Sequence, residues 1–256
     1  MILTAENYFS PEANSEYMSV SQFKSYKECE AKAVAESKGD YLEPMSTALI
    51  VGPYVDAYFE GSLPTFKAKH PELFKKDGGL KSDYVQAEDI ISRVEKDQLF
   101  MALMSGEKQV IMTGEILGVP FKIKIDSYHP GQSITDLKIM KDFKRIWNDE
   151  IHFKEYFVEA WGYDIQGAVY QEIEHQNSGF QLPFYIAGAT KEKETDIAAM
   201  EIKQPRLDFC LDVVKRDLGR IMLVKNGKVE PHRCGVCDYC KRTKQLTGIV
   251  DYTEVG

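Results

Sequence analysis

The sequence predicts a mixed α/β fold, in which a central mixed sheet contains an antiparallel three-strand meander and is flanked by helices. Two observations lead to this class. Apolar residues recur at helical spacing over residues 84–104, whereas residues 108–140 consist of short apolar and β-branched runs with turn residues between them. The sequence shows no internal repeat and no low-complexity linker, so we expect one domain.

The chain before residue 105 predicts three helices, over residues 19–37, 45–60 and 84–104. Ser19 or Ser21 begins the first of them, because a serine hydroxyl can accept a hydrogen bond from an N–H group of the first turn. The second helix is interrupted, or begins, near Gly52-Pro53, since proline is tolerated only in the first turn.

The segment that follows alternates apolar and polar residues, as half-buried strands do. Gly118 and the turn sequence HPGQ divide it into three strands, over residues 108–117, 119–126 and 133–140. The remaining chain predicts a long helix over 151–176 with Gly179 near its end, two strands over 181–190 and 196–203, and a last helix over 206–227.

The composition is that of a soluble globular protein, with 43% hydrophobic and 28% charged residues. No apolar run approaches the roughly 18 residues that span a bilayer. The N-terminus carries acidic residues and lacks a basic region, so we expect no secretory signal and a cytoplasmic, reducing setting. The net charge of −8 argues against a protein that holds nucleic acid by bulk positive charge, but it is compatible with a site where carboxylates hold metal ions.

The meander brings acidic residues together. If the hairpin is symmetric about Gly131, Asp126 lies opposite Asp136, with Cβ atoms about 5 Å apart. Two carboxylates at that distance repel each other unless a cation lies between them. Lys138 stands one pleat further along the same face as Asp136. A divalent metal site is therefore one interpretation, and a solvated face with a weak salt bridge is the other.

Two helices could complete such a site. Gly52, Asp56 and Glu60 lie on one stripe of the helix before the meander, which could deliver a further ligand or could be an exposed acidic stripe. Gln166 and Tyr170 share one stripe of the helix after the meander, where ordinary packing is the default interpretation.

Four features follow one another along the chain: an acid-bearing helix, KID at residues 124–126, ITDLK at 134–138 and QGAVY at 166–170. Their combination in this order resembles the PD-(D/E)XK nucleases. The likeness is closest to the branch that contains lambda exonuclease, the RecB nuclease domain and phage recombination exonucleases of the exodeoxyribonuclease VIII type. It spans roughly residues 19–240 and implies a restriction-endonuclease-like core.

The resemblance implies that Asp126 and Asp136 bind Mg²⁺ or Mn²⁺, joined by the backbone carbonyl of Leu137. It further implies that Lys138 positions the attacking water, and that the helix residues Gln166 and Tyr170 contact DNA.

RecB-like members carry a histidine on the first helix, where this chain has Asp56. Aspartate is a harder oxygen ligand, which suits Mg²⁺ or Mn²⁺. Whether Asp56, Glu60 or both bind the metal remains open at this point.

The C-terminal sequence CGVCDYC holds three cysteines, Cys234, Cys237 and Cys240, and in a reducing compartment such a cluster indicates a metal. The resemblance to the iron–sulfur subset of these nucleases implies Cys29 as the fourth ligand of a [4Fe–4S] cluster, although that subset usually has a longer final gap. The alternatives are Zn²⁺, bound by four cysteines or by three with His232, and reduced thiols. Cys210 is expected in the core.

The resemblance implies one nuclease domain over residues 1–256, with a helical N-terminal part at 15–105, a catalytic core at 106–225 and a cysteine-cluster tail at 226–256. It implies a phage or prophage recombination exonuclease that hydrolyses double-stranded DNA from its ends for a single-strand annealing recombinase. Ring-forming relatives leave a homo-oligomer open. The alternatives are an endonuclease or repair nuclease of the same fold, and a non-catalytic DNA-binding module with a cysteine-ligated metal.

Overall fold

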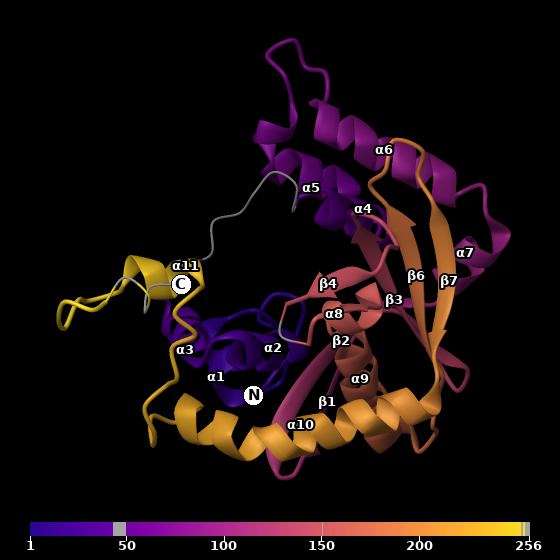
Figure 1. The fold of residues 1–256 in the computed structure, drawn as a ribbon. Helices are drawn as coiled ribbons and strands as arrows, with labels where there is room; N and C mark the ends of the chain where they lie inside the picture. The colour runs from indigo at the N-terminus through magenta and orange to yellow at the C-terminus, as the bar shows by residue number, and fades with distance from the viewer. Residues whose placement is uncertain (43–49, 150, 252, 254–256) are drawn as a thin grey trace. The chain divides into compact units, whose positions relative to one another are not determined.

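The structure is a computed structural model that describes residues 1–42, 50–149, 151–251 and 253 (Figure 1). Two compact units make up the chain. The first, the sheet unit, consists of Met1–Val20 and Pro44–Arg216, and the second, the cysteine unit, consists of Ser21–Glu43 and Asp217–Gly256. Each unit is described by itself below.

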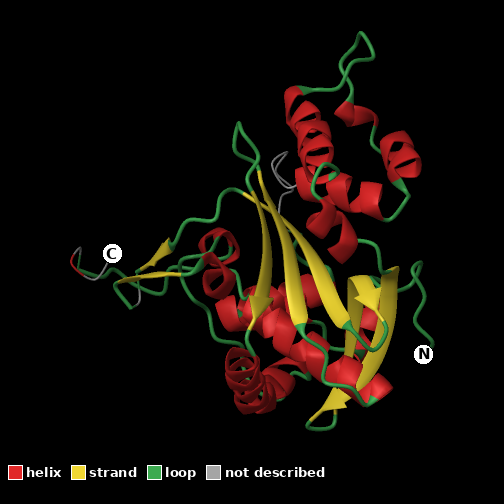
Figure 2. Ribbon diagram, turned by 90° about the vertical axis from the view of Figure 1, so that its right-hand side faces the viewer, coloured by secondary structure: helices red, strands yellow, loops and turns green. Residues whose placement is uncertain are grey.

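The sheet unit is built on a five-stranded sheet with the strand order β1-β2-β3-β6-β7. The strands are β1 (Glu107–Ile116), β2 (Val119–His129), β3 (Ser133–Met140), β6 (Phe184–Thr190) and β7 (Ile197–Ile202). All neighbours pair antiparallel except β3 and β6, which run parallel. The predicted mixed sheet with its antiparallel three-strand meander is thus confirmed, and Figure 2 shows it between helices.

Helices cover both faces of this sheet, whose central strands are largely buried. One face packs against α4 (Val51–Phe59), α6 (Ser82–Val94) and α7 (Gln98–Leu103), whose buried side chains form one core with Leu137, Ala187 and Ala189. Residues of the other parity, such as Phe184, face α9 (Tyr163–Ser178), where Gly167 would contact the Phe184 ring through any added Cβ. Between α4 and α6 lie α5 (Leu63–Lys69) and the 3₁₀ turn Pro71–Leu73.

The N-terminal segment is tied to β2. After α1 (Pro11–Glu16), Met18 donates its N–H to Pro120 O at 2.8 Å and accepts the N–H of Lys122 at 2.9 Å. The Lys122 side chain is buried, and its ammonium donates to Asn14 Oδ1 at 2.8 Å and to the Tyr8 carbonyl. A buried lysine thus fixes the first residues of the chain against the meander.

The predicted helix over residues 151–176 is wrong in its first half. The structure has a hairpin of β4 (Ile146–Asn148) and β5 (Phe153–Glu155), then α8 (Phe157–Ala160), and α9 begins only at Tyr163. Phe153, Phe157 and Ala160 mimic a helical stripe, but the chain pairs Phe153 with Asn148 and Gly162 turns with a φ of +60° before α9.

Other predicted helices differ at their bounds. Residues 84–104 form α6 and α7, because the Asp97 carboxylate accepts the N–H of Phe100 and begins a new helix. Residues 19–37 form α2 (Val20–Glu28) and α3 (Glu30–Lys38), separated by an extended Cys29. The predicted helix over 45–60 begins at Val51 with Gly52-Pro53 in its first turn, and residues 45–49 lie outside the described residues.

The cysteine unit contains α3, the end of α10 (Gln204–Lys225) and the short α11 (Asp238–Arg242). Its two chain segments are joined by the carboxylate of Glu30, which accepts from Arg220 Nε at 2.6 Å and from the N–H of His232 at 2.7 Å. Lys27 and Asp217 add an ion pair at 2.5 Å. Across the described ranges of both units, no helix has the length and apolar composition that crossing a bilayer requires.

Two helical glycines give a matched test of this packing. A Cβ at Gly167 would lie 2.8 Å from Phe184 Cδ1 and 3.0 Å from Leu207 Cδ2, so Gly167→Ala should push α9 from the sheet and cost about 1–3 kcal/mol. A Cβ at Gly219 meets nothing within 4 Å, so Gly219→Ala should stabilise by about 0.5–1 kcal/mol. Urea unfolding measures both, and equal effects would contradict the close packing of α9.

Candidate active site

The β2–β3 hairpin has the register that the sequence predicts. Ser127 pairs with Thr135 and His129 with Ser133, around a turn in which Gly131 has a φ of +68°. The next opposed positions in this register are Asp126 and Asp136. At these positions a side-chain oxygen replaces the backbone carbonyl as acceptor, because Asp126 Oδ2 accepts the N–H of Leu137 at 3.0 Å.

Asp136 is the most enclosed of the acidic residues that the sequence singled out, with 2% of its surface exposed. Its Oδ1 accepts from Gln166 Nε2 at 2.5 Å, and its Oδ2 lies 2.5 Å from Lys138 Nζ. Burial, together with the charge of Asp126, raises the pKa of Asp136 to about 6, although Lys138 opposes the shift.

Lys138 remains protonated in this setting. Burial alone would lower the pKa of its ammonium, but the charges of Asp136 and Asp126 outweigh burial and raise it above the ordinary value. The pKa of Asp136 rises although its partner is a cation, and the pKa of Lys138 rises because its partner is an anion. Lys138 is therefore charged. It faces the carboxylate of Asp136, whose ionised form is disfavoured by burial and by the charge of Asp126.

The α4 helix contributes Asp56. Burial raises the pKa of this carboxyl well above its usual value, and the next largest cause is repulsion from Asp126, with Asp136 adding to it. Such coupling requires Asp56 to lie near both meander aspartates. Glu60, one turn later, caps the C-terminus of α4 and is exposed. The two residues of the predicted acidic stripe are therefore in different environments, and Asp56 is the one in the acidic cluster.

The donor set fits a divalent cation. Three aspartates and one ammonium leave two net negative charges, and carboxylate oxygens are the ligands that Mg²⁺ and Mn²⁺ prefer. The buried oxygen Gln109 Oε1 accepts no hydrogen bond from the described residues. Within the described part of the chain these carboxylates are not gathered around one point. Lys138 contacts an oxygen of Asp136, and the Leu137 N–H donates to an oxygen of Asp126.

Two residues near the site were not predicted from the sequence. Gln109 on β1 has a φ of +54°, which only a small fraction of non-glycine residues adopt, and its Nε2 donates to Asp126 Oδ1 at 3.3 Å. Tyr163, the first residue of α9, places its ring centroid 5.2 Å from Lys138 Nζ. The sequence pattern marked neither residue as part of a site. Gln109 has the residue type of an ordinary strand position, and Tyr163 lay inside the helix that was wrongly predicted to begin at residue 151.

The two residues predicted on α9, Gln166 and Tyr170, make different contacts. Gln166 reaches Asp136, as described above. Tyr170 instead donates its hydroxyl hydrogen to the Lys124 carbonyl at 3.1 Å, and its ring packs edge-on against Phe184. Tyr170 therefore joins α9 to β2, and Arg206, 2.6 Å from the carboxylate of Asp164, fixes the first turn of the same helix.

A second cluster lies in the cysteine unit. The sulfurs of Cys29, Cys234, Cys237 and Cys240 all lie within 4.8 Å of one another, so this cluster could bind a metal ion. His232 is not part of this group, and its backbone serves the contacts with Glu30 and Ala31. Cys210 is buried in α10, as the sequence predicted.

Comparison with known proteins identifies the family to which this fold belongs. A family model described as a PDDEXK-like domain of unknown function matches residues 19–243. The chain belongs to this PDDEXK-like family. The resemblance inferred from KID, ITDLK and QGAVY is thus confirmed.

The crystal structure of a "putative exonuclease" from Eubacterium rectale is similar to this PDDEXK-like chain, with 49% sequence identity and a TM-score of 0.95. The similarity covers 99% of this chain and 98% of that chain. No curated protein matches the sequence. The family and the solved structure together support a nuclease.

The raised pKa of Asp56 has a consequence for stability. A carboxyl whose pKa is raised on folding stabilises the protein fully below its unfolded pKa of about 4, and this contribution is lost as the pH rises through the raised value. In a chelating buffer at pH 8, Asp56→Asn should therefore melt at a higher temperature than the wild type, with a difference that vanishes as the pH falls toward about 4.

The exposed Glu60→Gln is the matched control for this thermal melt, and its melting temperature should show no such dependence on pH. The same profile in both variants, or no gain for Asp56→Asn at pH 8, would show that Asp56 is not crowded by the other aspartates.

Proposed function

We propose that this protein is a metal-dependent deoxyribonuclease, and specifically an exonuclease of the phage recombination type that hydrolyses double-stranded DNA from its ends. The observation that carries the proposal is the ion pair of the buried Asp136 with the half-buried Lys138, which lies beside Asp126 in a PDDEXK-like fold. A carboxylate and an ammonium enclosed together are costly for a fold, and a reaction on a charged phosphodiester accounts for their presence.

Asp56, Asp126 and Asp136 would hold Mg²⁺ or Mn²⁺, together with the backbone carbonyl of Leu137. When bound, the cation supplies Lewis acidity and lowers the pKa of a coordinated water. It also offsets the repulsion that raises the pKa values of Asp56 and Asp136. Glu60 is exposed, so we assign it no contact with the metal in this proposal.

Lys138 acts as a charged donor. Since its pKa is raised, it is not a general base at neutral pH, and its three hydrogens can orient a water and stabilise negative charge on the phosphate. Tyr163 presents its ring to the ammonium and limits the directions in which Lys138 can point. The lysine thereby keeps its charge where the reaction builds up negative charge.

Two amides position the aspartates. Gln166 donates to Asp136 Oδ1, and Gln109 donates to Asp126 Oδ1, so that each carboxylate is held by a neighbouring element. We propose that Gln166 also contacts the DNA, while Tyr170 acts on it indirectly by fixing α9 through the Lys124 carbonyl. The net charge of −8 means that DNA is bound by local cations such as Lys138 and by the metal.

The finer features of the proposal rest on the family resemblance and on the similar "putative exonuclease". They are action on double-stranded ends, a single-strand annealing recombinase as partner, and self-association. An endonuclease or repair nuclease of the same fold is the first competitor. A DNA-binding module without catalysis is the second, and the enclosed lysine–aspartate pair argues against it.

One digestion separates these functions. Linear and covalently closed circular duplex DNA are incubated with Mg²⁺ or with EDTA, and the products are resolved on a gel. The proposal expects loss of the linear form only, and only with Mg²⁺. Cleavage of the circle would indicate an endonuclease, and intact DNA in both lanes with a mobility shift would indicate a binding module.

Substitution of the pair tests the catalytic residues. Asp136→Asn and Lys138→Ala should each lower the rate of DNA hydrolysis by at least about 100-fold, because each removes charge from the reacting centre. Glu72→Gln neutralises an exposed carboxylate outside the site and should keep the wild-type rate. Circular dichroism checks that the variants are folded, and wild-type turnover by either site variant would refute the assignment.

A further inference from the structure

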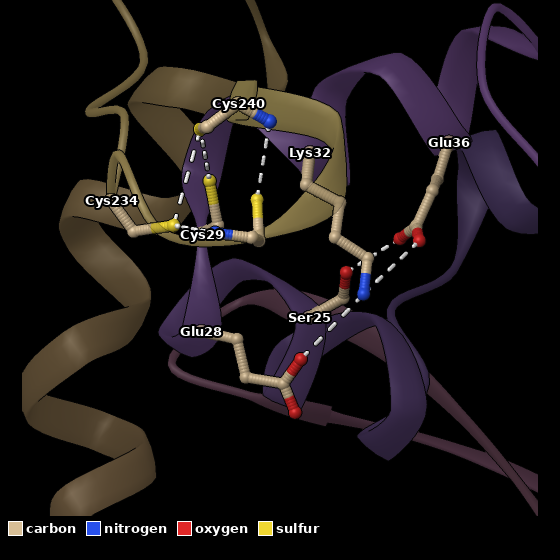
Figure 3. A network of polar contacts seen from close by, with 8 residues as sticks. Ser25, Glu28, Cys29, Lys32, Glu36, Cys234 and Cys240 are labelled. Carbon is tan, nitrogen blue, oxygen red and sulfur yellow. Dashed lines mark hydrogen bonds and ion pairs between the residues drawn. The ribbon is translucent and has the colours of Figure 1, made fainter. Parts of the chain in front are cut away.

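The four cysteines come from places far apart in the chain but close together in the cysteine unit. Cys29 lies between α2 and α3, and the other three belong to the C-terminal tail around α11. Figure 3 shows the sulfurs of Cys29, Cys234 and Cys240 pointing toward one another. The sulfur of Cys240 lies 3.5 Å from that of Cys29 and 3.9 Å from that of Cys234.

These distances distinguish between metals. Zinc binds four thiolates as a tetrahedron with Zn–S bonds of about 2.3 Å, so that its sulfurs are about 3.8 Å apart. In a [4Fe–4S] cubane each thiolate binds a different corner of the cluster, which places the cysteine sulfurs about 6 Å apart. In this protein all four sulfurs lie within 4.8 Å of one another. We propose that Cys29, Cys234, Cys237 and Cys240 bind one tetrahedral zinc ion, not an iron–sulfur cluster.

The tail has the local geometry of such a ligand set. Cys234 Sγ accepts the N–H of Cys237, and Cys237 Sγ accepts the N–H of Cys240, each at 3.4 Å. N–H groups aimed at sulfur stabilise the thiolate form that a metal binds. Gly235 makes the first of these turns possible with a φ of +77°. The short C-x₂-C-x₂-C spacing therefore places successive sulfurs close to one another.

Contacts that do not involve sulfur already bring the two segments together. The Ala31 N–H donates to the His232 carbonyl at 3.0 Å, and Glu30 accepts from Arg220 and from the His232 N–H. On the other side, Tyr41 and Tyr239 pack edge to face with ring centroids 5.3 Å apart. The ligands are therefore pre-arranged, which lowers the entropy that metal binding has to overcome.

Few apolar side chains pack directly around the four sulfurs. The hydrophobic cluster here consists of Cys29, Ala31 and Cys240, with the remaining cysteines and Tyr239 against it. Other apolar side chains of the unit, such as Phe23 and Ile221, are buried outside this cluster, so a metal would fix the tail where apolar packing is sparse. One ion bound by residue 29 and by residues 234–240 would close a loop of about 200 residues. The zinc is therefore structural, and the proposal stands independently of the nuclease assignment.

Metal analysis of the full-length protein tests this directly. Protein from cells supplied with both iron and zinc should contain one zinc per chain, no acid-labile sulfide and no visible colour. Cobalt exchanged for zinc should give the intense visible bands of a tetrahedral thiolate site. Stoichiometric iron with sulfide, a cysteine pair found oxidised in the freshly purified protein, or neither metal would each overturn the proposal.

Single substitutions identify the ligands. Cys29→Ser and Cys237→Ser should each lose at least nine-tenths of the zinc, whereas Cys210→Ser, which changes a buried cysteine outside the cluster, should retain it. Zinc at wild-type occupancy in Cys29→Ser would show that the tail binds alone and would refute the remote ligand. If the serine variants do not fold, a chelator titration of the wild-type protein gives the stoichiometry instead.

Hydrogen exchange tests the structural role. Removal of zinc with a chelator should speed amide exchange in residues 21–42 and 217–251 by at least about tenfold while β2, β3 and β6 remain protected. Unchanged exchange in those two segments would mean that the ion does not hold the unit together.

Discussion

The charge on Asp136 is the constraint around which the sheet unit is arranged. A carboxylate with 2% of its surface exposed loses nearly all of its hydration, and the fold has to supply other partners. Lys138 supplies the charge and Gln166 supplies a hydrogen bond, one from the same strand and one from α9. The compensation is incomplete, since the pKa of Asp136 is still raised to about 6. In the proposed nuclease, a divalent cation would supply the missing compensation.

The β2–β3 hairpin, α9 and β6 hold this carboxylate in place. Gly131 sets the hairpin register that brings Asp126 opposite Asp136. Gly167 allows α9 to approach β6, so that Gln166 can reach across. The parallel pairing of β3 with β6 places Asp136 beside Ile186, in a strand that pairs with β6 along its length from Ile134. A strand in that position cannot move its acidic residue to solvent without losing the core.

The sequence was sufficient for the meander because alternation and a central Gly131 determine which residues oppose each other. It could not distinguish Asp56 from Glu60, since both lie on one helical stripe and only the packing of α4 makes Asp56 half-buried while Glu60 stays exposed. Gln109 was equally out of reach, because its residue type does not indicate the positive φ that it adopts where the β1–β2 register skips it. The β4–β5 hairpin was missed where apolar spacing imitates a helix.

The cysteine spacing indicated a metal, but the choice among metals depends on sulfur distances that no spacing rule contains. For the acidic site the corresponding question is whether the aspartates hold one cation in common. Anomalous diffraction from crystals soaked in Mn²⁺ answers it most directly. We expect one strong peak within about 2.5 Å of carboxylate oxygens of both Asp126 and Asp136, beside Lys138. No peak there, or a peak bound to only one of these aspartates, would contradict this expectation.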